Sequence, residues 1–157
     1  MTQQLVIDHV SKVFGGLKAV ADVTMTIEQG TLIALIGPNG AGKTTLLSIL
    51  AAQNLDTKGS ITYNGLPVWE NRKALDHICF SRELNPITGY VQNTYKVKDY
   101  LRAASIYMPN WDKELAEHLL KEFELDKKKR ISRLSKGMMS MVTIIIALAS
   151  RADYTFL

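Results

Sequence analysis

One stretch of this 157-residue sequence has residue types and spacing that could hold a phosphate group: Gly37–Thr44, GPNGAGKT. It fits the pattern G-x-x-x-x-G-K-[ST] at every position. Glycines permit positive φ angles and a close approach of the backbone, so that successive amide N–H groups can surround a phosphate. The lysine adds a positive charge, and the hydroxyl that follows can ligate Mg²⁺. The stretch, called the phosphate loop below, therefore predicts a nucleotide-binding site.

The pattern also predicts a role for each side chain of the loop. Lys43 would bridge the β- and γ-phosphates of the nucleotide, and the Thr44 hydroxyl would ligate Mg²⁺. A helix beginning near Lys43 would add the positive potential of its N-terminus. We expect a nucleotide and Mg²⁺ at this site, and Lys43 and Thr44 as the catalytic residues. The residues expected to contact the nucleotide here are Gly37, Pro38, Asn39, Gly40, Ala41, Gly42, Lys43, Thr44 and Thr45.

The flanking residues predict the elements that position such a loop. The continuous apolar run 32–36, LIALI, predicts a strand buried on both faces. Residues 43–52 predict a helix, and residues 22–28 alternate between polar and apolar side chains, as in a half-buried strand. A strand, a glycine-rich loop and a helix in this order are typical of an α/β fold with a parallel sheet.

The remaining patterns predict three short strands and three helices. A hairpin turn at Asn64-Gly65 follows the first of these strands. Asp112 is placed to cap the second helix. The expected strands are 60–63, 78–80 and 154–157, and the expected helices are 97–106, the one that Asp112 caps, and 135–150. The inward face of the last helix is expected to carry Met139, Val142, Ile145, Ile146 and Ala149.

Composition excludes several classes of protein. With 46% hydrophobic and 22% charged residues, the sequence is neither disordered, collagen-like nor a coiled coil. A single cysteine, Cys79, excludes a disulfide within the chain and fits a reducing compartment. No apolar stretch approaches the roughly 20 residues that cross a bilayer, and the first residues lack the layout of a signal peptide. These counts indicate a soluble cytosolic protein.

A second motif, Leu134–Met138 (LSKGM), precedes an apolar helix. Taken alone, Ser135 would be an ordinary N-cap. Together with the phosphate loop, this signature segment resembles the nucleotide-binding domain of ATP-binding-cassette (ABC) proteins, whose signature is LSGGQ or, in one branch, LSKGM. The resemblance implies that Ser135 and Gly137 bind the γ-phosphate of ATP held by a partner subunit, in a head-to-tail dimer.

The resemblance covers the whole chain and implies its organisation. It implies a P-loop NTPase core with a small antiparallel β subdomain, formed by residues 1–83 and 139–157, and a helical subdomain at 84–138 that contacts a membrane partner. Phe14 falls where the family has an aromatic side chain that stacks on adenine.

A glutamine that helps to ligate Mg²⁺ in the family should follow the strand at 78–80. By position this residue is Glu83, whereas Gln92 keeps the residue type. Glu83 is favoured because a carboxylate is also a hard oxygen ligand for Mg²⁺. The choice between Glu83 and Gln92 stays open.

The resemblance also implies a strand of four apolar residues followed by an Asp-Glu pair that serves the metal and the attacking water. Residues 154–157 match the four apolar positions. The chain is therefore expected to be a C-terminally incomplete domain, truncated just before the acidic pair. Because proton transfer supplies about 10²–10⁴-fold in rate, this stretch should bind ATP and hydrolyse it poorly.

Several features are similar to those of exporters whose ATPase and membrane subunits are separate chains, namely the signature segment and YMPNWD at 107–112. The expected partner is a separate permease, with the ATPase on the inner face of the cell membrane. Three alternatives stay open: a non-transport ABC ATPase on ribosomes or DNA, another P-loop NTPase such as a small kinase or GTPase, and a regulatory fragment that binds nucleotide without chemistry. The net charge of +4 and the run Lys127–Arg130 favour the first slightly. No nucleic-acid partner is expected, because such a run is usually a solvated surface.

Overall fold

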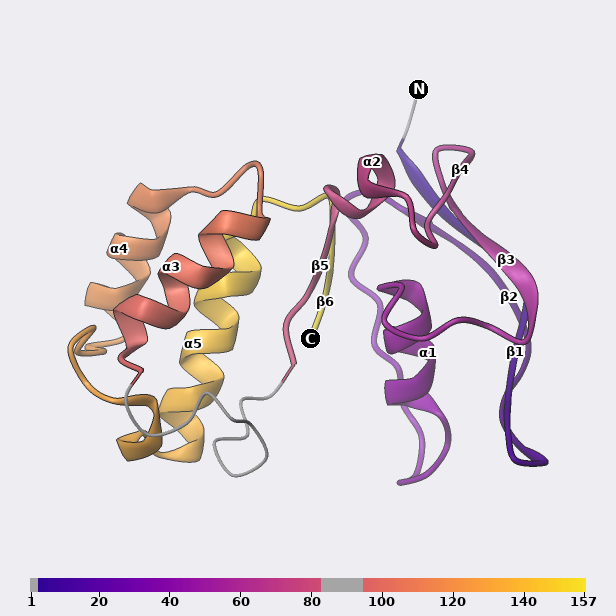
Figure 1. Ribbon diagram of the computed structural model, residues 1–157, viewed down its shortest axis with the longest axis horizontal. Coiled ribbons are helices and arrows are strands. Elements are labelled where there is room, and N and C mark those ends of the chain that lie inside the picture. The colour runs from indigo at the N-terminus through magenta and orange to yellow at the C-terminus, as the bar shows by residue number, and fades with distance from the viewer. Residues whose placement is uncertain (1–2, 83–94) are drawn as a thin grey trace. The chain divides into compact units, whose positions relative to one another are not determined.

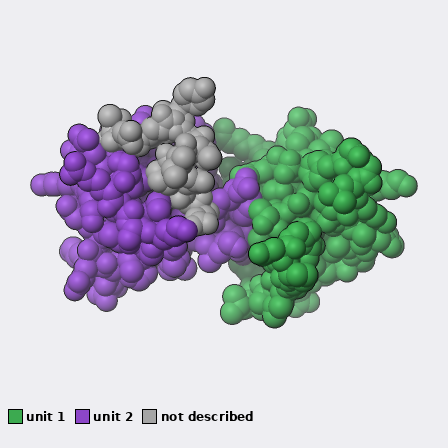
Figure 2. All heavy atoms as spheres, turned by 90° about the horizontal axis from the view of Figure 1, so that it is seen from below, with its two compact units in different colours: residues 1–78 green, residues 79–157 purple. Residues whose placement is uncertain are grey.

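The computed structural model describes residues 3–82 and 95–157. These residues form two compact units, 1–78 and 79–157, coloured separately in Figure 2. Glu83 and Gln92 lie outside the described residues, so the choice between them stays a prediction. In the stretches 3–82 and 95–157, no helix is long and apolar enough to cross a membrane.

The first unit is built on a four-stranded antiparallel sheet with the strand order β2-β1-β3-β4 (Figure 1). Strands β1 (Gln4–Phe14) and β2 (Leu17–Glu28) form a long hairpin that pairs from Gln4↔Glu28 to Phe14↔Leu17. Side chains alternate between the buried and the exposed face of β2, which confirms the strand expected at 22–28. The turn of this hairpin therefore carries Phe14 at its edge.

A second hairpin joins β3 (Lys58–Tyr63) to β4 (Leu66–Pro67). Its two turn residues, Asn64 and Gly65, have φ angles of 47° and 80°. Two consecutive positive φ angles define the turn type that matches the twist of paired strands. The hairpin turn expected from the sequence is thus confirmed, and so is the antiparallel character of the β subdomain. A single helical turn, α2 (Arg72–Leu75), follows and was not predicted.

The strand predicted at residues 32–36 is wrong. No strand among the described residues pairs with this segment, which has no regular secondary structure and precedes the phosphate loop. Leu32 is 100% exposed and Ile36 is 93% exposed. An apolar run becomes a buried strand only where neighbouring strands satisfy its backbone N–H and C=O groups. The helix that follows the loop, α1 (Lys43–Leu50), is confirmed and ends two residues earlier than expected.

The second unit packs three helices around one apolar core: α3 (Val97–Tyr107), α4 (Lys113–Glu122) and α5 (Lys136–Ala149). They lie side by side in Figure 1. All five α5 residues expected to face inward are buried: Met139, Val142, Ile145, Ile146 and Ala149. A short 3-10 turn, Ile131–Arg133, precedes α5.

Strands β5 (Ile78–Phe80) and β6 (Tyr154–Phe156) lie where strands are expected. They pair with each other. The Ser81 N–H donates to the Phe156 carbonyl at 2.9 Å. The division between the units falls after Ile78 and groups α5 and β6 with α3 and α4. The subdomain boundaries at 83 and 138 stay a prediction.

Asp112 caps α4, as the sequence predicts. Its Oδ1 accepts from the Leu115 N–H at 2.8 Å, and its Oδ2 accepts from the Arg151 Nη2 at 2.7 Å. The hydrogen bond from Leu115, followed by that from Arg151, lowers the pKa of the Asp112 carboxyl. The Asp112 N–H also donates to the Ala149 carbonyl, so the start of α4 is tied to the end of α5.

Candidate nucleotide-binding site

The phosphate loop leads directly into α1, and the geometry of its backbone depends on glycine. Gly40 and Gly42 have φ angles of 83° and 85°, a region that residues with a Cβ rarely adopt. The Ala41 N–H donates to the Pro38 carbonyl at 3.2 Å and closes a tight turn. Gly42 is the N-cap of α1 and provides no side-chain acceptor for the amides of the first helical turn. Those amides therefore need another acceptor, which an anion can supply.

Gly42 is also required for space. A Cβ on Gly42 would lie 2.1 Å from the Ala19 carbonyl oxygen of β2, far inside van der Waals contact. A Cβ on Gly40 would meet nothing within 4 Å, and one on Gly37 would make an ordinary contact of 3.4 Å with Ala41. The loop is thus pressed against β2 at Gly42. Gly40 is needed for its backbone conformation alone.

The Lys43 side chain crosses back over the loop. Its ammonium donates to the Gly37 carbonyl at 2.7 Å and to the Pro38 carbonyl at 2.8 Å. These bonds hold a full positive charge beside the loop, near the N-terminus of α1. The Thr44 side chain lies on the exposed part of the same helical turn. A cation, uncapped amides and a hydroxyl within one turn form the donor set that phosphate oxygens and Mg²⁺ require.

A cavity of about 430 Å³ joins this loop to the β1–β2 hairpin. It is lined by Asn39–Thr45 of the loop and α1, and by Phe14, Leu17, Lys18 and Ala19 of the hairpin. Its volume lies in the range of small-molecule sites. The structure therefore brings Phe14, which is 46% exposed, to the same cavity as the predicted phosphate contacts.

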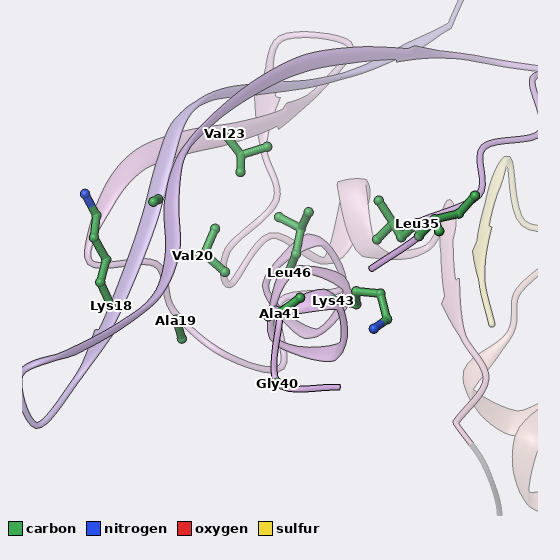
Figure 3. A pocket seen from close by; sticks show the side chains of 12 residues that line it. Lys18, Ala19, Val20, Val23, Leu35, Gly40, Ala41, Lys43 and Leu46 are labelled. Atoms are coloured by element: carbon green, nitrogen blue, oxygen red, sulfur yellow. The ribbon is translucent and has the colours of Figure 1, made fainter. Parts of the chain in front are cut away.

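A second cavity of about 500 Å³ also borders the phosphate loop (Figure 3). Val20 and Val23 of β2 and Leu46 of α1 point into it. Leu35 and Ile36, from the segment predicted to be a strand, also line it. This cavity offers fewer polar groups than the first, which remains the better candidate for a charged nucleotide.

Sequence reasoning did not single out Lys18 and Ala19. They reach the loop because the tight Gly15-Gly16 turn sends β2 back along β1, pairing Phe14 with Leu17. A glycine pair between two runs of alternating polar and apolar residues predicts a hairpin. This pattern could have identified the residues opposite Phe14.

The signature residues lie in the second unit. Ser135 is the N-cap of α5, and its Oγ accepts from the Met138 N–H at 3.2 Å. Ser135 and Gly137 are both exposed. The contact of Ser135 and Gly137 with a nucleotide held by a partner subunit stays a prediction.

Two lysines of the basic run Lys127–Arg130 contact other side chains of the same chain. The Lys127 ammonium forms an ion pair with Glu117 at 2.9 Å, and the Lys129 ammonium contacts the Met138 sulfur at 3.6 Å. These contacts fit a structural role for the run, because they direct two of its four charges toward neighbouring side chains. No cluster of three or more His, Cys, Asp or Glu residues that could hold a metal occurs within 3–82 and 95–157.

A phosphate loop at a helix N-terminus, with an aromatic side chain in the same cavity, is the arrangement of a P-loop nucleotide-binding domain. The model of the ABC transporter family matches residues 20–157, and the chain belongs to that family. Membership excludes the alternative of a small kinase or GTPase, and it confirms the fold class expected from the sequence.

Individual relatives support this assignment. The chain is 32% identical over 144 residues to the ABC transporter ATP-binding protein YtrB of Bacillus subtilis, covering 91% of this chain and 48% of YtrB. It is 34% identical over 149 residues to the ribose import ATP-binding protein RbsA of Rhodopirellula baltica, covering 90% of this chain and 29% of RbsA. This chain therefore spans about half of YtrB and less than a third of RbsA.

A solved structure shows the same fold. An ABC transporter ATP-binding protein from Pyrococcus furiosus superposes with a TM-score of 0.75 at 33% identity, covering 95% of this chain and 72% of the other.

Proposed function

We propose that this chain is the ATP-binding part of an ABC transporter subunit, and that it binds Mg²⁺-ATP in the cavity between the phosphate loop and Phe14. The observation that carries the proposal is the joint lining of one cavity of about 430 Å³ by Phe14 and by Asn39–Thr45. Family membership and the name of YtrB, an ATP-binding protein, support it.

Each part of the site has a separate task. The loop amides and the Lys43 ammonium would bind the phosphate oxygens, because charge-assisted hydrogen bonds to a preformed donor set cost little reorganisation. Thr44 would place its hydroxyl on Mg²⁺, which neutralises charge on the β- and γ-phosphates. Phe14 would offer a face for the adenine. Glu83 is proposed as a further metal ligand on the family resemblance alone.

A direct test is equilibrium binding of a fluorescent ATP analogue to the 157-residue chain. Removing the Lys43 ammonium with Lys43→Ala should weaken binding about ten- to hundredfold, because hydrogen bonds to charged groups contribute about 1.5–3 kcal/mol. Lys113→Ala removes the same charge from an exposed position at the start of α4 and is the matched control. Equal affinities for the two variants would contradict the proposed site.

The signature segment supports a second proposal, that two copies of the subunit pair head to tail. Each nucleotide would then lie between the phosphate loop of one copy and Ser135 and Gly137 of the other. Ser135→Arg should abolish ATP-dependent dimerisation in analytical ultracentrifugation and leave ADP binding unchanged. Dimerisation that survives this substitution would refute the arrangement.

The transport role and its direction are also proposals. We propose a separate permease as partner, a location on the cytoplasmic face of the membrane, and export as the direction. The proposed export direction rests on the motifs LSKGM and YMPNWD. The names of the relatives do not support export, because RbsA, a relative of similar identity, is named for import. Co-purification of the full-length protein with a membrane protein would support the role. Co-purification with ribosomes or DNA instead would favour the non-transport alternative.

For residues 1–157 taken alone, we propose nucleotide binding with slow hydrolysis. The predicted sites within them provide phosphate and metal contacts but no carboxylate placed to activate water. The expected ATPase rate is at least about a hundredfold below that of an intact relative assayed in parallel, because general-base catalysis contributes about 10²–10⁴-fold. A rate equal to that of the intact relative would disprove this.

A further inference from the structure

Beside the nucleotide cavity, a lysine that does not line it lies over the ring of Phe14. The Lys12 Nζ is 4.8 Å from the centroid of the ring. Lys12 and Phe14 are two residues apart on β1, so both side chains emerge on the same face of the strand. A cation within about 6 Å of an aromatic face is attracted by the negative charge of the π system. The Phe14 ring is 46% exposed, so packing fixes its position only in part. The contact with the Lys12 ammonium therefore adds to the stability of this position.

The lysine is itself anchored to a different part of the unit. Its ammonium donates to the Leu55 carbonyl at 2.6 Å, in the loop that follows α1. Two further bonds tie β1 to the same loop: the Thr57 N–H donates to the Ser11 carbonyl at 2.7 Å, and the Val13 N–H donates to the Thr57 Oγ1 at 3.1 Å. The position of Lys12 is thus fixed relative to the helix that carries the phosphate loop at its other end.

The Phe14 ring adjoins both the Lys12 ammonium and the cavity. Phe14 lines the cavity with the phosphate loop, whereas Lys12 is absent from its described lining. An ammonium bound to one face leaves the other face for a planar, electron-rich ligand. A purine base is such a ligand, and stacking of a base on an aromatic side chain contributes about 1–3 kcal/mol in nucleic-acid sites.

We propose that Lys12 is a positioning residue for the nucleotide base: it holds the Phe14 ring against the cavity and so raises affinity for the base without touching the phosphates. This inference rests on the proposed function of the site. Lys12 acts through Phe14, so its effect must depend on that ring and on the presence of a base in the ligand.

The test measures how ATP and inorganic tripolyphosphate each displace a fluorescent ATP analogue from the 157-residue chain. Lys12→Met keeps an unbranched side chain that is one atom shorter and removes its charge. It should weaken ATP about two- to fivefold, the equivalent of a cation–π contact at an exposed site, and leave tripolyphosphate unchanged. Lys12→Arg should restore ATP affinity. Lys18→Met is the matched control, because Lys18 lines the cavity itself and should affect both ligands.

A double-mutant cycle separates this role from a general one. In a Phe14→Ala background, Lys12→Met should have no further effect on ATP. The proposal is overturned if Lys12→Met weakens both ligands equally, if it weakens neither, or if its effect on ATP persists without the ring. Unchanged tripolyphosphate binding also shows that the variant is folded. If neither ligand binds the unaltered chain, the proposed nucleotide site itself fails.

Discussion

Helices α1 and α5 both begin at a residue that the sequence assigns to phosphate binding, yet they satisfy their first-turn amides in different ways. The N-cap of α1 is Gly42, which has no side chain to accept a hydrogen bond. The N-cap of α5 is Ser135, whose Oγ accepts from the Met138 N–H. One helix leaves donors for a ligand, and the other uses its own side chain.

Because of this difference, the two proposed anion sites of the chain have different requirements. The α1 terminus is shaped by close packing of Gly42 against β2, so its donors are arranged before any ligand arrives. At the α5 terminus the Ser135 oxygen already accepts a bond, but its O–H remains a donor. Ser135 can therefore cap the helix and still donate to a phosphate oxygen presented by a partner. We infer that α1 carries the affinity for nucleotide and α5 the dependence on a second subunit.

The largest expected effect comes from Gly42→Ala. The added Cβ would collide with the Ala19 carbonyl, and the φ angle of 85° would be strained. Left-handed backbone strain and overpacking together should lower the free energy of unfolding by about 2–5 kcal/mol and abolish nucleotide binding. Gly40→Ala has the same backbone strain without the collision and should cost only about 1–2 kcal/mol. Denaturant unfolding of both variants measures the difference, and equal losses would contradict the packing argument.

Ser135→Ala should have a smaller effect and a different pattern. Loss of the capping oxygen should lower the free energy of unfolding by about 1 kcal/mol. ADP affinity should not change, because the cavity proposed for ADP is lined by the phosphate loop, α1 and the β1–β2 hairpin and not by Ser135. Ser135→Asp retains a capping oxygen and should recover the stability, while its negative charge should still prevent ATP-dependent dimerisation. A loss of ADP affinity in either variant would remove the distinction between the two helices.

The smallest effect concerns α4, whose N-cap is charged. Interactions with Leu115 and Arg151 lower the pKa of Asp112, so the native state favours the carboxylate. This contribution is fully present above the unfolded pKa of about 3.9 and is lost as pH falls through the lower folded pKa. Asp112→Asn keeps a capping oxygen without the charge. Its melting temperature should lie below that of the unaltered chain at pH 7, and the gap should close as pH falls below about 4. A gap that does not depend on pH would exclude this linkage, whereas the penalty for Ser135→Ala should stay constant over the same range.

The sequence predicted local features best. The caps at Asp112 and Ser135 and the turn at Asn64-Gly65 depend on neighbours within a few residues, and all three are found. The buried face of α5 was also predicted, since a helix satisfies its own backbone and needs only one apolar face. The strand at 32–36 was not found, because a strand depends on partners distant in sequence.

Part of the candidate site likewise could not be predicted from the sequence. The phosphate loop was identified from its residue types, and Phe14 from the family resemblance. Lys18 and Ala19 enter the cavity only through the register of a hairpin, and Lys12 matters only because a loop beyond α1 holds its ammonium. Such contacts depend on three-dimensional packing, which composition and spacing do not encode.

The most direct test of the central claim is a titration of the ¹⁵N-labelled 157-residue chain with Mg²⁺-ADP, followed by the chemical shifts of backbone amides. ADP lacks the γ-phosphate that the signature segment is proposed to contact, so it reports on the α1 site alone. We expect large shifts at Gly40–Thr45 and none at Lys136–Met138. Shifts confined to Lys136–Met138, or none at the phosphate loop, would contradict it.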